Sequence, residues 1–335
     1  MNLEEVARRA KVSSATVSRV LNNKALVRSS TRERVMKAIS DLNYHPNLHA
    51  RNLAAGKSRT FGVLVSNMEN PFFYDIVCQL ELEAHRAGYE VVVANTNYHP
   101  EQLLKSIRLM KERRVAGLAA MVSEINPEVI DELEGAKFPV VFYDVGPVGL
   151  NLANVRLNYR KGMDKIASYL HLLGHNSRIA WLGHHVDFAP LFERRDALIN
   201  AFKRLAPEAT VRSFIGTDNL EGGWQTMREM LSSSYAPTAV VCANDFMAVG
   251  ALRALREEGI AVPRQMSITG FDNIKLAEFC YPALTTIHVD RQRIGHIVFE
   301  KLIQSVESEG DHSSEFLIEP DLIVRDSTGP APDVA

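Results

Sequence analysis

The chain has 335 residues and 46% hydrophobic side chains, which is enough for a small headpiece domain followed by a larger body with its own core. Its three cysteines, Cys78, Cys242 and Cys280, are too far apart for a C-x-x-C pair or a secreted disulfide framework. No signal peptide opens the chain and no apolar run approaches the roughly 20 residues of a membrane helix, so we expect a cytoplasmic protein without a membrane partner.

The net charge of −2 hides an asymmetry between the two parts of the chain. Residues 1–60 hold twelve Lys or Arg against four Asp or Glu, a net charge of +8, so the remainder carries −10. Lysine and arginine neutralise DNA phosphates and supply most non-specific DNA affinity. A basic segment on an acidic body therefore indicates a nucleic-acid-binding head, and the alternative is a solvated basic tail.

Helical signals begin at the first residues. Asn2 and Glu5 have the spacing of a capping box, which predicts a helix over about residues 3–10. Ser13 is a good N-cap for a second helix that continues to Leu21. The turn between these two helices is short.

A third helix is predicted over about residues 31–42. Ser30 and Glu33 have the spacing of a second capping box at its start. Three short helices with a tight turn between the first two are typical of a helix-turn-helix domain, which we assign to residues 1–46.

This part of the chain resembles the LacI/GalR family of transcription regulators. The resemblance is carried by VA at 6–7, VSSATVSRVLN at 12–22, TRERV at 31–35 and LNYHPN at 42–47, and it continues with looser motifs to about residue 325. It implies a homodimeric, sequence-specific DNA-binding regulator, a repressor, whose partners are operator DNA and a small-molecule effector.

In a helix-turn-helix the second helix enters the major groove of DNA. Ser14, Ala15 and Arg19 match the base-reading positions of the family, and an arginine can make a bidentate contact to guanine. Val17 and Val20 are predicted core residues. Caps or phosphate contacts are predicted at Ser13, Thr16, Ser18, Asn22 and Thr31. The predicted DNA-binding set is completed by Tyr44, Asn47, His49 and Ala50.

The stretch 47–56 is helix-prone but too short to be stable alone, and Gly56 closes it. The resemblance implies a hinge helix within a linker over 47–59, with Leu53 as an apolar wedge in the minor groove. The alternative is a flexible linker.

From residue 60 onward, β-rich runs alternate with amphipathic helical segments, which predicts parallel sheets covered by helices. The predicted strands are 61–66, 90–95, 117–121, 140–143, 179–182, 211–215, 239–243 and 267–271. The fold class is therefore α/β, with two doubly wound lobes over residues 60–325 after the all-α headpiece. The resemblance implies a periplasmic-binding-protein-like core with three crossings, expected near 154–160, 282–286 and 313–323. Residues 326–335 are predicted to be a flexible tail without the leucine heptads that join dimers into tetramers.

Ligands of open α/β sheets bind beyond the carboxyl ends of the strands. This rule selects the predicted effector residues Phe72, Phe73, Ser123, Asp144, Arg195, Asn244, Asp245, Phe246 and Asp272. Simpler roles remain open for several of them: helix capping for Asp245 and Asp272, a surface charge for Arg195, and core packing for Phe72 or Phe73.

Carboxylates, a guanidinium and aromatic rings suit a sugar or sugar derivative, with a purine as the alternative. Where the family usually has an acidic residue before Asn158, this chain has Leu157, so the usual sugar pattern is incomplete.

No G-x-S-x-G, H-E-x-x-H, G-x-G-x-x-G or complete phosphate loop occurs, so we expect no enzyme, no cofactor and no metal site. The i, i+4 pair His171 and His175 lacks a third ligand at a plausible spacing and is interpreted as packing. A transported sugar-binding protein would need a signal peptide, and an architectural DNA binder would not need a two-lobed cleft. We expect the effector to favour one lobe arrangement and thereby change the spacing of the hinge segments.

Overall fold

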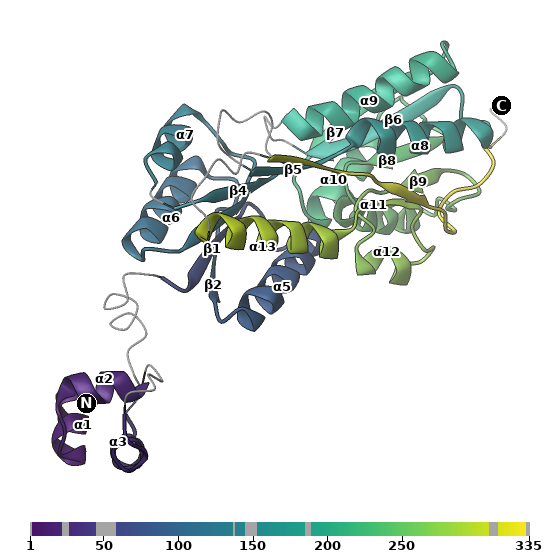
Figure 1. Ribbon diagram of the computed structural model, residues 1–335. Helices are drawn as coiled ribbons and strands as arrows, with labels where there is room; N and C mark the ends of the chain where they lie inside the picture. Colours follow the sequence, from purple (N-terminus) through teal and green to yellow (C-terminus); the bar gives the residue numbers. More distant parts are fainter. Residues whose placement is uncertain are drawn as a thin grey trace. The chain divides into compact units, whose positions relative to one another are not determined.

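Figure 1 shows the computed structural model, which describes residues 2–21, 27–44, 58–136, 138–144, 153–184, 189–307 and 314–332. The chain divides into two compact units, Met1–Ser58 and Arg59–Ala335. We call the first unit the headpiece and the second unit the body.

Three helices form the headpiece: α1 (Leu3–Ala10), α2 (Ser14–Leu21) and α3 (Ser29–Asp41). One small core joins them through the buried side chains of Val6, Ala7, Ala10, Val17, Val20, Val35 and Ala38. The predicted helices over 3–10 and 14–21 and the two predicted core valines are confirmed.

The start of α1 has the predicted capping box. The Glu5 amide donates to Asn2 Oδ1 at 3.0 Å, and the Asn2 amide donates to Glu5 Oε2 at 3.1 Å. Ser13 Oγ accepts from the Thr16 amide at 3.2 Å, as expected for a side chain that caps α2. Backbone donors at both helix starts are therefore satisfied by local side chains.

The second predicted capping box is wrong. The third helix begins at Ser29, two residues earlier than predicted, and its N-cap residue is Arg28, whose side chain makes no cap hydrogen bond. Ser30 therefore lies inside the first helical turn, where its backbone is already helical and it cannot act as the N-cap.

The body has two lobes. In lobe 1 six parallel strands have the order β11-β5-β4-β3-β1-β2. These strands are β1 (Thr60–Val65), β2 (Glu90–Asn95), β3 (Gly117–Met121), β4 (Val140–Tyr143), β5 (Ala153–Leu157) and β11 (Ser314–Ile318). The sequence analysis did not predict β5 or β11 as strands.

Helices cover both faces of the lobe 1 sheet. One face packs against α5 (Pro71–Arg86) and α13 (Arg291–Glu307), which lie side by side (Figure 1). The other face packs against α6 (Pro100–Glu112) and α7 (Pro127–Glu134). Strands buried on both faces are expected in a parallel sheet with helical crossovers.

In lobe 2 four parallel strands have the order β7-β6-β8-β9: β6 (Arg178–His184), β7 (Thr210–Gly216), β8 (Ala239–Cys242) and β9 (Ser267–Thr269). One face packs against α8 (Tyr159–Leu172) and α9 (Ala189–Leu205). The other packs against α10 (Leu220–Leu231), α11 (Asp245–Glu257) and α12 (Lys275–Phe279). The two doubly wound lobes of the predicted fold class are confirmed.

The chain passes between the lobes three times in the described part. The first passage is the short link from β5 to α8, within the predicted range. The second follows β10 (Thr286–His288) and leads into α13, a few residues later than predicted. The third lies between β11 and β12 (Asp321–Ile323), which pairs antiparallel with β10.

The segment after residue 325 differs from the predicted flexible tail. The Ser327 side chain is fully buried, and its hydroxyl donates to the Ile268 carbonyl at 2.7 Å and accepts from the Thr285 amide at 2.8 Å. The Ile268 amide also donates to the Ser327 carbonyl at 2.9 Å. Residues 326–332 therefore run along the edge of β9, because that exposed edge offers backbone groups that need partners.

Candidate functional site

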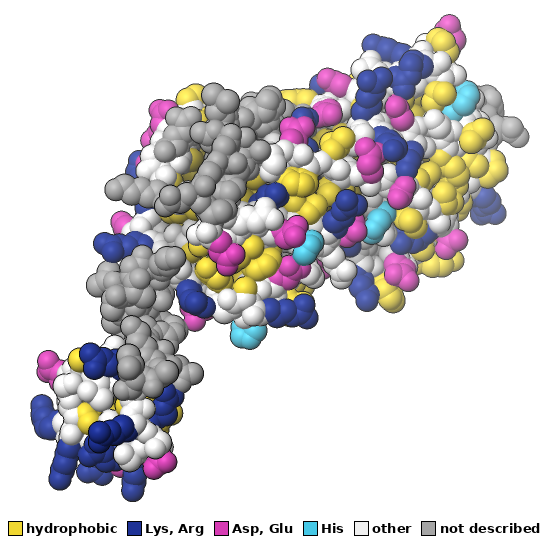
Figure 2. Space-filling model, viewed as in Figure 1, with side chains coloured by type: hydrophobic (Ala, Val, Ile, Leu, Met, Phe, Trp, Pro, Cys, Tyr) yellow, Lys and Arg dark blue, Asp and Glu magenta, His cyan; other side chains and the backbone are white. Residues whose placement is uncertain are grey.

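The exposed side of α2 carries the predicted base-reading residues. Ala15 and Arg19 are exposed and Ser14 is half-buried, whereas Val17 and Val20 face the core. Figure 2 shows Lys and Arg side chains over much of the visible headpiece surface. An exposed helix face with an arginine on a basic unit has the composition that DNA binding requires.

The other predicted DNA contacts are distributed over the same unit. Ser13 is exposed and Thr16, Ser18, Thr31 and Tyr44 are half-buried, and Tyr44 packs against the headpiece core. The remaining ones, Asn22, Asn47, His49, Ala50 and Leu53, lie outside the described residues.

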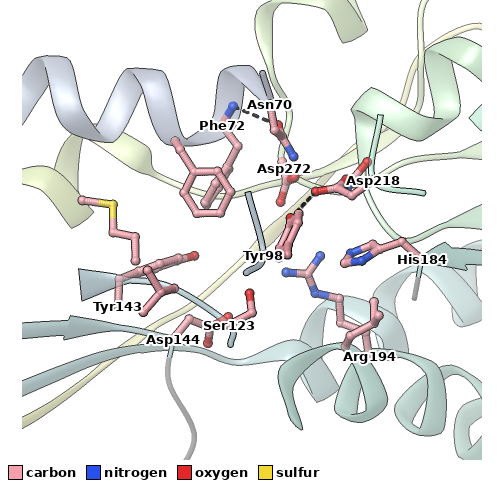
Figure 3. Close-up of a pocket in the computed structure, with 15 residues that line it drawn as sticks. Asn70, Phe72, Tyr98, Ser123, Tyr143, Asp144, His184, Arg194, Asp218 and Asp272 are labelled. Carbon is pink, nitrogen blue, oxygen red and sulfur yellow. Dashed lines mark hydrogen bonds between the residues drawn. The ribbon is translucent and has the colours of Figure 1, made fainter. Parts of the chain in front are cut away.

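A cleft lies between the two lobes, at the carboxyl ends of their strands (Figure 3). It opens to solvent, so a small molecule can reach it. It is lined by Asn70, Phe72, Phe73, Tyr98, Met121, Val122, Ser123, Tyr143, Asp144, His184, Leu191, Arg194, Asp218, Asn244 and Asp272.

Lobe 1 contributes an aromatic wall. Asn70 caps α5 by accepting a hydrogen bond from the Phe72 amide at 3.1 Å, and this places Phe72 and Phe73 in the first helical turn. The two rings meet edge to face with centroids 5.3 Å apart, and Phe72 also contacts the Tyr143 ring. Ser123 follows β3 on the same side of the cleft.

Asp144 follows β4 and belongs to a buried polar chain. The Tyr159 hydroxyl donates to Asp144 Oδ2, and Arg194 Nη2 donates to the Tyr159 oxygen at 2.8 Å. Burial raises the pKa of the Asp144 carboxyl well above its usual range, although the Arg194 charge opposes this shift.

Lobe 2 contributes Arg194 rather than its neighbour Arg195. Arg194 Nη1 donates to the Ala243 carbonyl at 2.8 Å, and the guanidinium lies 4.6 Å from the centroid of the Phe271 ring. Arg195 is absent from the lining of the cleft; its Nε donates to Asp196 Oδ1 at 3.0 Å on the surface of α9.

Asp272 lines the cleft with a buried carboxyl group to which no described residue donates a hydrogen bond. Its backbone has a φ of +108°, and Arg291 Nη1 holds its carbonyl oxygen. Burial raises the pKa of Asp272 to about 7, against the opposing charges of Arg194 and Arg291. A φ in this region is costly for a residue with a side chain, so the neighbouring contacts must hold it in place.

The predicted segment 244–246 divides between the cleft and the core. Asn244 lines the cleft and caps α11. Asp245 is fully buried, accepts from the Thr286 hydroxyl at 2.5 Å and from the Ile274 amide at 2.8 Å, and does not line the cleft. Phe246 packs in the hydrophobic core.

Other kinds of site find no support in the described residues. They contain no group of three or more His, Cys, Asp or Glu that could hold a metal ion. None of their helices has the length and apolarity to cross a membrane. His175 is buried and contacts the side chains of Thr238 and Ser267, as its interpretation as a packing residue requires.

Two family models match the chain. Residues 2–47 match the model described as bacterial regulatory proteins, lacI family, and residues 167–328 match the periplasmic binding protein-like domain. The HTH-type transcriptional repressor PurR of Vibrio vulnificus is 36% identical over 331 residues, with 97% of this chain and 98% of the relative covered. The chain belongs to the lacI family of bacterial regulatory proteins.

Solved structures of the family have the same fold over 81% to 98% of this chain. The lac repressor dimer bound to operator and the anti-inducer ONPF has a TM-score of 0.84 and 28% identity, with 98% of this chain and 99% of that chain covered. A LacI family regulator from Enterococcus faecium with bound ribose has a TM-score of 0.73 and 26% identity, with 81% of this chain and 99% of that chain covered. This lacI-family chain is a DNA-binding transcription repressor under the control of a small ligand.

The cleft of this chain also contains polar residues that the sequence analysis missed. Tyr98 follows β2, His184 ends β6 and Asp218 follows β7. All three obey the strand-end rule that selected the other residues, so applying that rule to every predicted strand would have found them. Arg194 was missed because two adjacent arginines on one helix differ only in the direction of their side chains.

Proposed function

We propose that this lacI-family repressor binds a purine-type ligand in the cleft and operator DNA through the exposed face of α2. The observation that carries the proposal is one cleft with an aromatic wall, Phe72 and Phe73, across from polar groups at strand ends. Flat ring systems pack against aromatic rings, and their edge N–H and C=O groups need polar partners.

The polar partners available for such a ligand come from three elements. The Tyr143 hydroxyl and the Asp272 carboxyl have no hydrogen-bond partner among the described residues, and the Ser123 hydroxyl also lines the cleft. We propose that Arg194, and not Arg195, supplies the positive charge of the site. Asp245 and Phe246 hold the surrounding structure in place and do not contact the ligand.

The ligand class proposed here differs from the one that the cleft residues favoured in the sequence analysis. Relatives 31% to 36% identical over 96% to 97% of this chain are named PurR repressors, which supports the purine alternative better than the sugar. A sugar remains the second candidate because a solved family member holds ribose.

Calorimetric titration of the purified protein with nucleobases, nucleosides and simple sugars tests the ligand class. We expect binding of at least one nucleobase or nucleoside, with a matching change in affinity for DNA in a shift assay. Binding of sugars alone would contradict the purine proposal and support a sugar as the ligand. Ligand binding also raises thermal stability by mass action, which gives an independent readout.

Lowering the pH should weaken binding of a ligand whose N–H donates to Asp272. The Asp272 pKa is raised to about 7 by burial, so its acceptor carboxylate is present above that pH and is protonated as the pH falls below it. We expect affinity to fall up to about tenfold per pH unit between pH 7 and 5.5 and to level off above 7. Measured dissociation constants should lose this dependence in Asp272→Asn, and an unchanged slope in that variant would contradict the assignment.

We also propose that the repressor acts as a homodimer, because two headpieces on a partly palindromic site require a two-fold partner. The solved operator complex named above is a dimer. On the body, Leu276, Phe279 and Tyr281 expose 40%, 70% and 92% of their surface around α12, which favours this patch as part of the contact.

The double variant Phe279→Glu/Tyr281→Glu should dissociate the homodimer, because buried unpaired charges oppose association. We expect sedimentation of a monomer at micromolar concentration and at least about a tenfold loss of operator affinity. Leu172→Glu is the matched control, since Leu172 is 82% exposed on α8 and should leave the dimer intact. A double variant that still sediments as a dimer would remove this patch from the interface.

A further inference from the structure

Asp218 connects the two lobes across the cleft. Its carboxylate accepts from the Tyr98 hydroxyl at 2.6 Å and from Asn67 Nδ2 at 3.2 Å, both on lobe 1. On lobe 2, Asn244 Nδ2 donates to its other oxygen at 2.6 Å. Figure 3 shows the Tyr98 contact beside His184 and Arg194. A half-buried carboxyl group therefore lies at the cleft with donors from both lobes directed at it.

The contacts favour the ionised form of Asp218. Amide nitrogens only donate, so the oxygens that face Asn67 and Asn244 must act as acceptors. Burial alone would raise the pKa of Asp218, but the His184 charge and the hydrogen bonds from Tyr98 and the two asparagines outweigh it and lower the pKa. The cleft therefore contains a fixed negative charge at neutral pH.

The Arg194 guanidinium in the cleft is partly engaged by the chain. Arg194 is the only Lys or Arg among the residues that line the cleft in the described part of the chain. Its two terminal nitrogens donate to the Ala243 carbonyl and the Tyr159 hydroxyl, and its plane lies 4.3 Å from the Tyr159 ring centroid. Its Nε has no partner among the described residues, and His184, whose charge lowers the pKa of Asp218, is the other cleft residue that can be positive.

We propose that Asp218 is a specificity-determining residue that admits uncharged ligands with hydrogen-bond donors and rejects phosphorylated or carboxylated ones. The inference rests on the proposed function for the location of the ligand. In a partly enclosed cleft, a carboxylate close to a ligand phosphate disfavours binding, and three aspartates line this cleft against one arginine. Free nucleobases and nucleosides satisfy this rule, and their 5′-monophosphates violate it.

Paired ligands separate the effect of charge from the effect of shape. Calorimetry would compare adenosine, guanosine and inosine with their 5′-monophosphates, and ribose with ribose 5-phosphate. We expect the wild-type chain to favour the uncharged member by about 100-fold or more. Asp218→Asn, which keeps the size and removes the charge, should reduce that ratio by at least about tenfold, and Asp218→Ser is a second charge-removing variant if the amide variant does not fold.

Two control variants test whether Asp218 has only a structural role. Glu229→Gln removes one exposed negative charge from α10 and should leave the ratio unchanged. Tyr98→Phe weakens the link between the lobes without changing charge, so it should weaken both members of a pair alike. If the Asp218 variants behave like Tyr98→Phe, with affinity lost and the ratio unchanged, Asp218 only ties the lobes together and the inference is wrong.

The outcomes also distinguish this inference from the proposed ligand class. Binding of ribose without any purine would overturn the purine assignment. The comparison of ribose with ribose 5-phosphate would then test whether the cleft rejects charged ligands. Purine binding with equal or tighter binding of the monophosphate would support the ligand class and overturn the role of Asp218. Failure of every uncharged probe to bind would contradict both.

Discussion

Replacing Arg194 with alanine is expected to abolish the response of DNA binding to the ligand while leaving ligand-free operator affinity within a few fold. The guanidinium holds the Ala243 carbonyl and the Tyr159 hydroxyl and opposes the effect of burial on Asp144 and Asp272. Arg194 is half-buried, and removing a hydrogen-bonded charge from a binding site costs about 2 to 5 kcal/mol, roughly 30-fold to several thousand-fold in affinity. Calorimetry and a shift assay with and without ligand measure the two effects separately.

Arg195→Ala is the matched control for this experiment. It removes the same side chain one residue later on α9, where the guanidinium pairs with Asp196 and lies over Phe192 outside the cleft. We expect ligand affinity within about twofold of wild type, because exposed ion pairs contribute little. If Arg195→Ala lost the ligand and Arg194→Ala kept it, the assignment would return to the residue predicted from the sequence.

The second large effect is expected at Arg19 in the headpiece. Arg19→Ala should cost about 1 to 3 kcal/mol on the specific operator and much less on random DNA, because a bidentate contact to guanine distinguishes one base pair from another. Arg19 is exposed on α2, whose opposite side is held in the core by Val17 and Val20. The fold of the headpiece should therefore survive the change, which circular dichroism can check.

Arg34→Ala provides the comparison, since it removes one exposed positive charge from α3 of the same unit. Loss of a purely electrostatic contact weakens specific and random DNA alike and lowers the salt dependence of binding. Fluorescence anisotropy on both DNAs at several salt concentrations gives the two ratios. Equal losses on operator and random DNA for Arg19→Ala would show that Arg19 contacts phosphate rather than a base.

The secondary structure of the headpiece could be predicted well because its signals are local. Helical spacing of small apolar residues gave the first two helices, and the Asn2 and Glu5 capping box depends only on residues three apart. The failure at Ser30 has a local cause too. Several polar residues precede that helix, and backbone geometry rather than residue type decides which of them is the N-cap.

In the body, strands in the centres of the sheets were predictable and those at the lobe connections were not. The runs that became β1 and β8 are almost wholly buried and apolar. By contrast β11 has an exposed or half-buried residue at four of its five positions and forms by pairing with β5, more than 150 residues away. A pairing at that distance leaves little trace in a short window of sequence.

The sequence by itself determined the helix-turn-helix, the alternating α/β body and the end of the sheets at which a ligand would bind, because these follow from short-range periodicity and from a general property of parallel sheets. Only the tertiary structure decided that Arg194 rather than Arg195 lines the cleft and that Asp218 meets Asn67 and Tyr98. The direction of a side chain on a helix depends on what the helix packs against. Contacts between lobes join residues about 120 to 150 positions apart, and they exist only once both sheets are assembled.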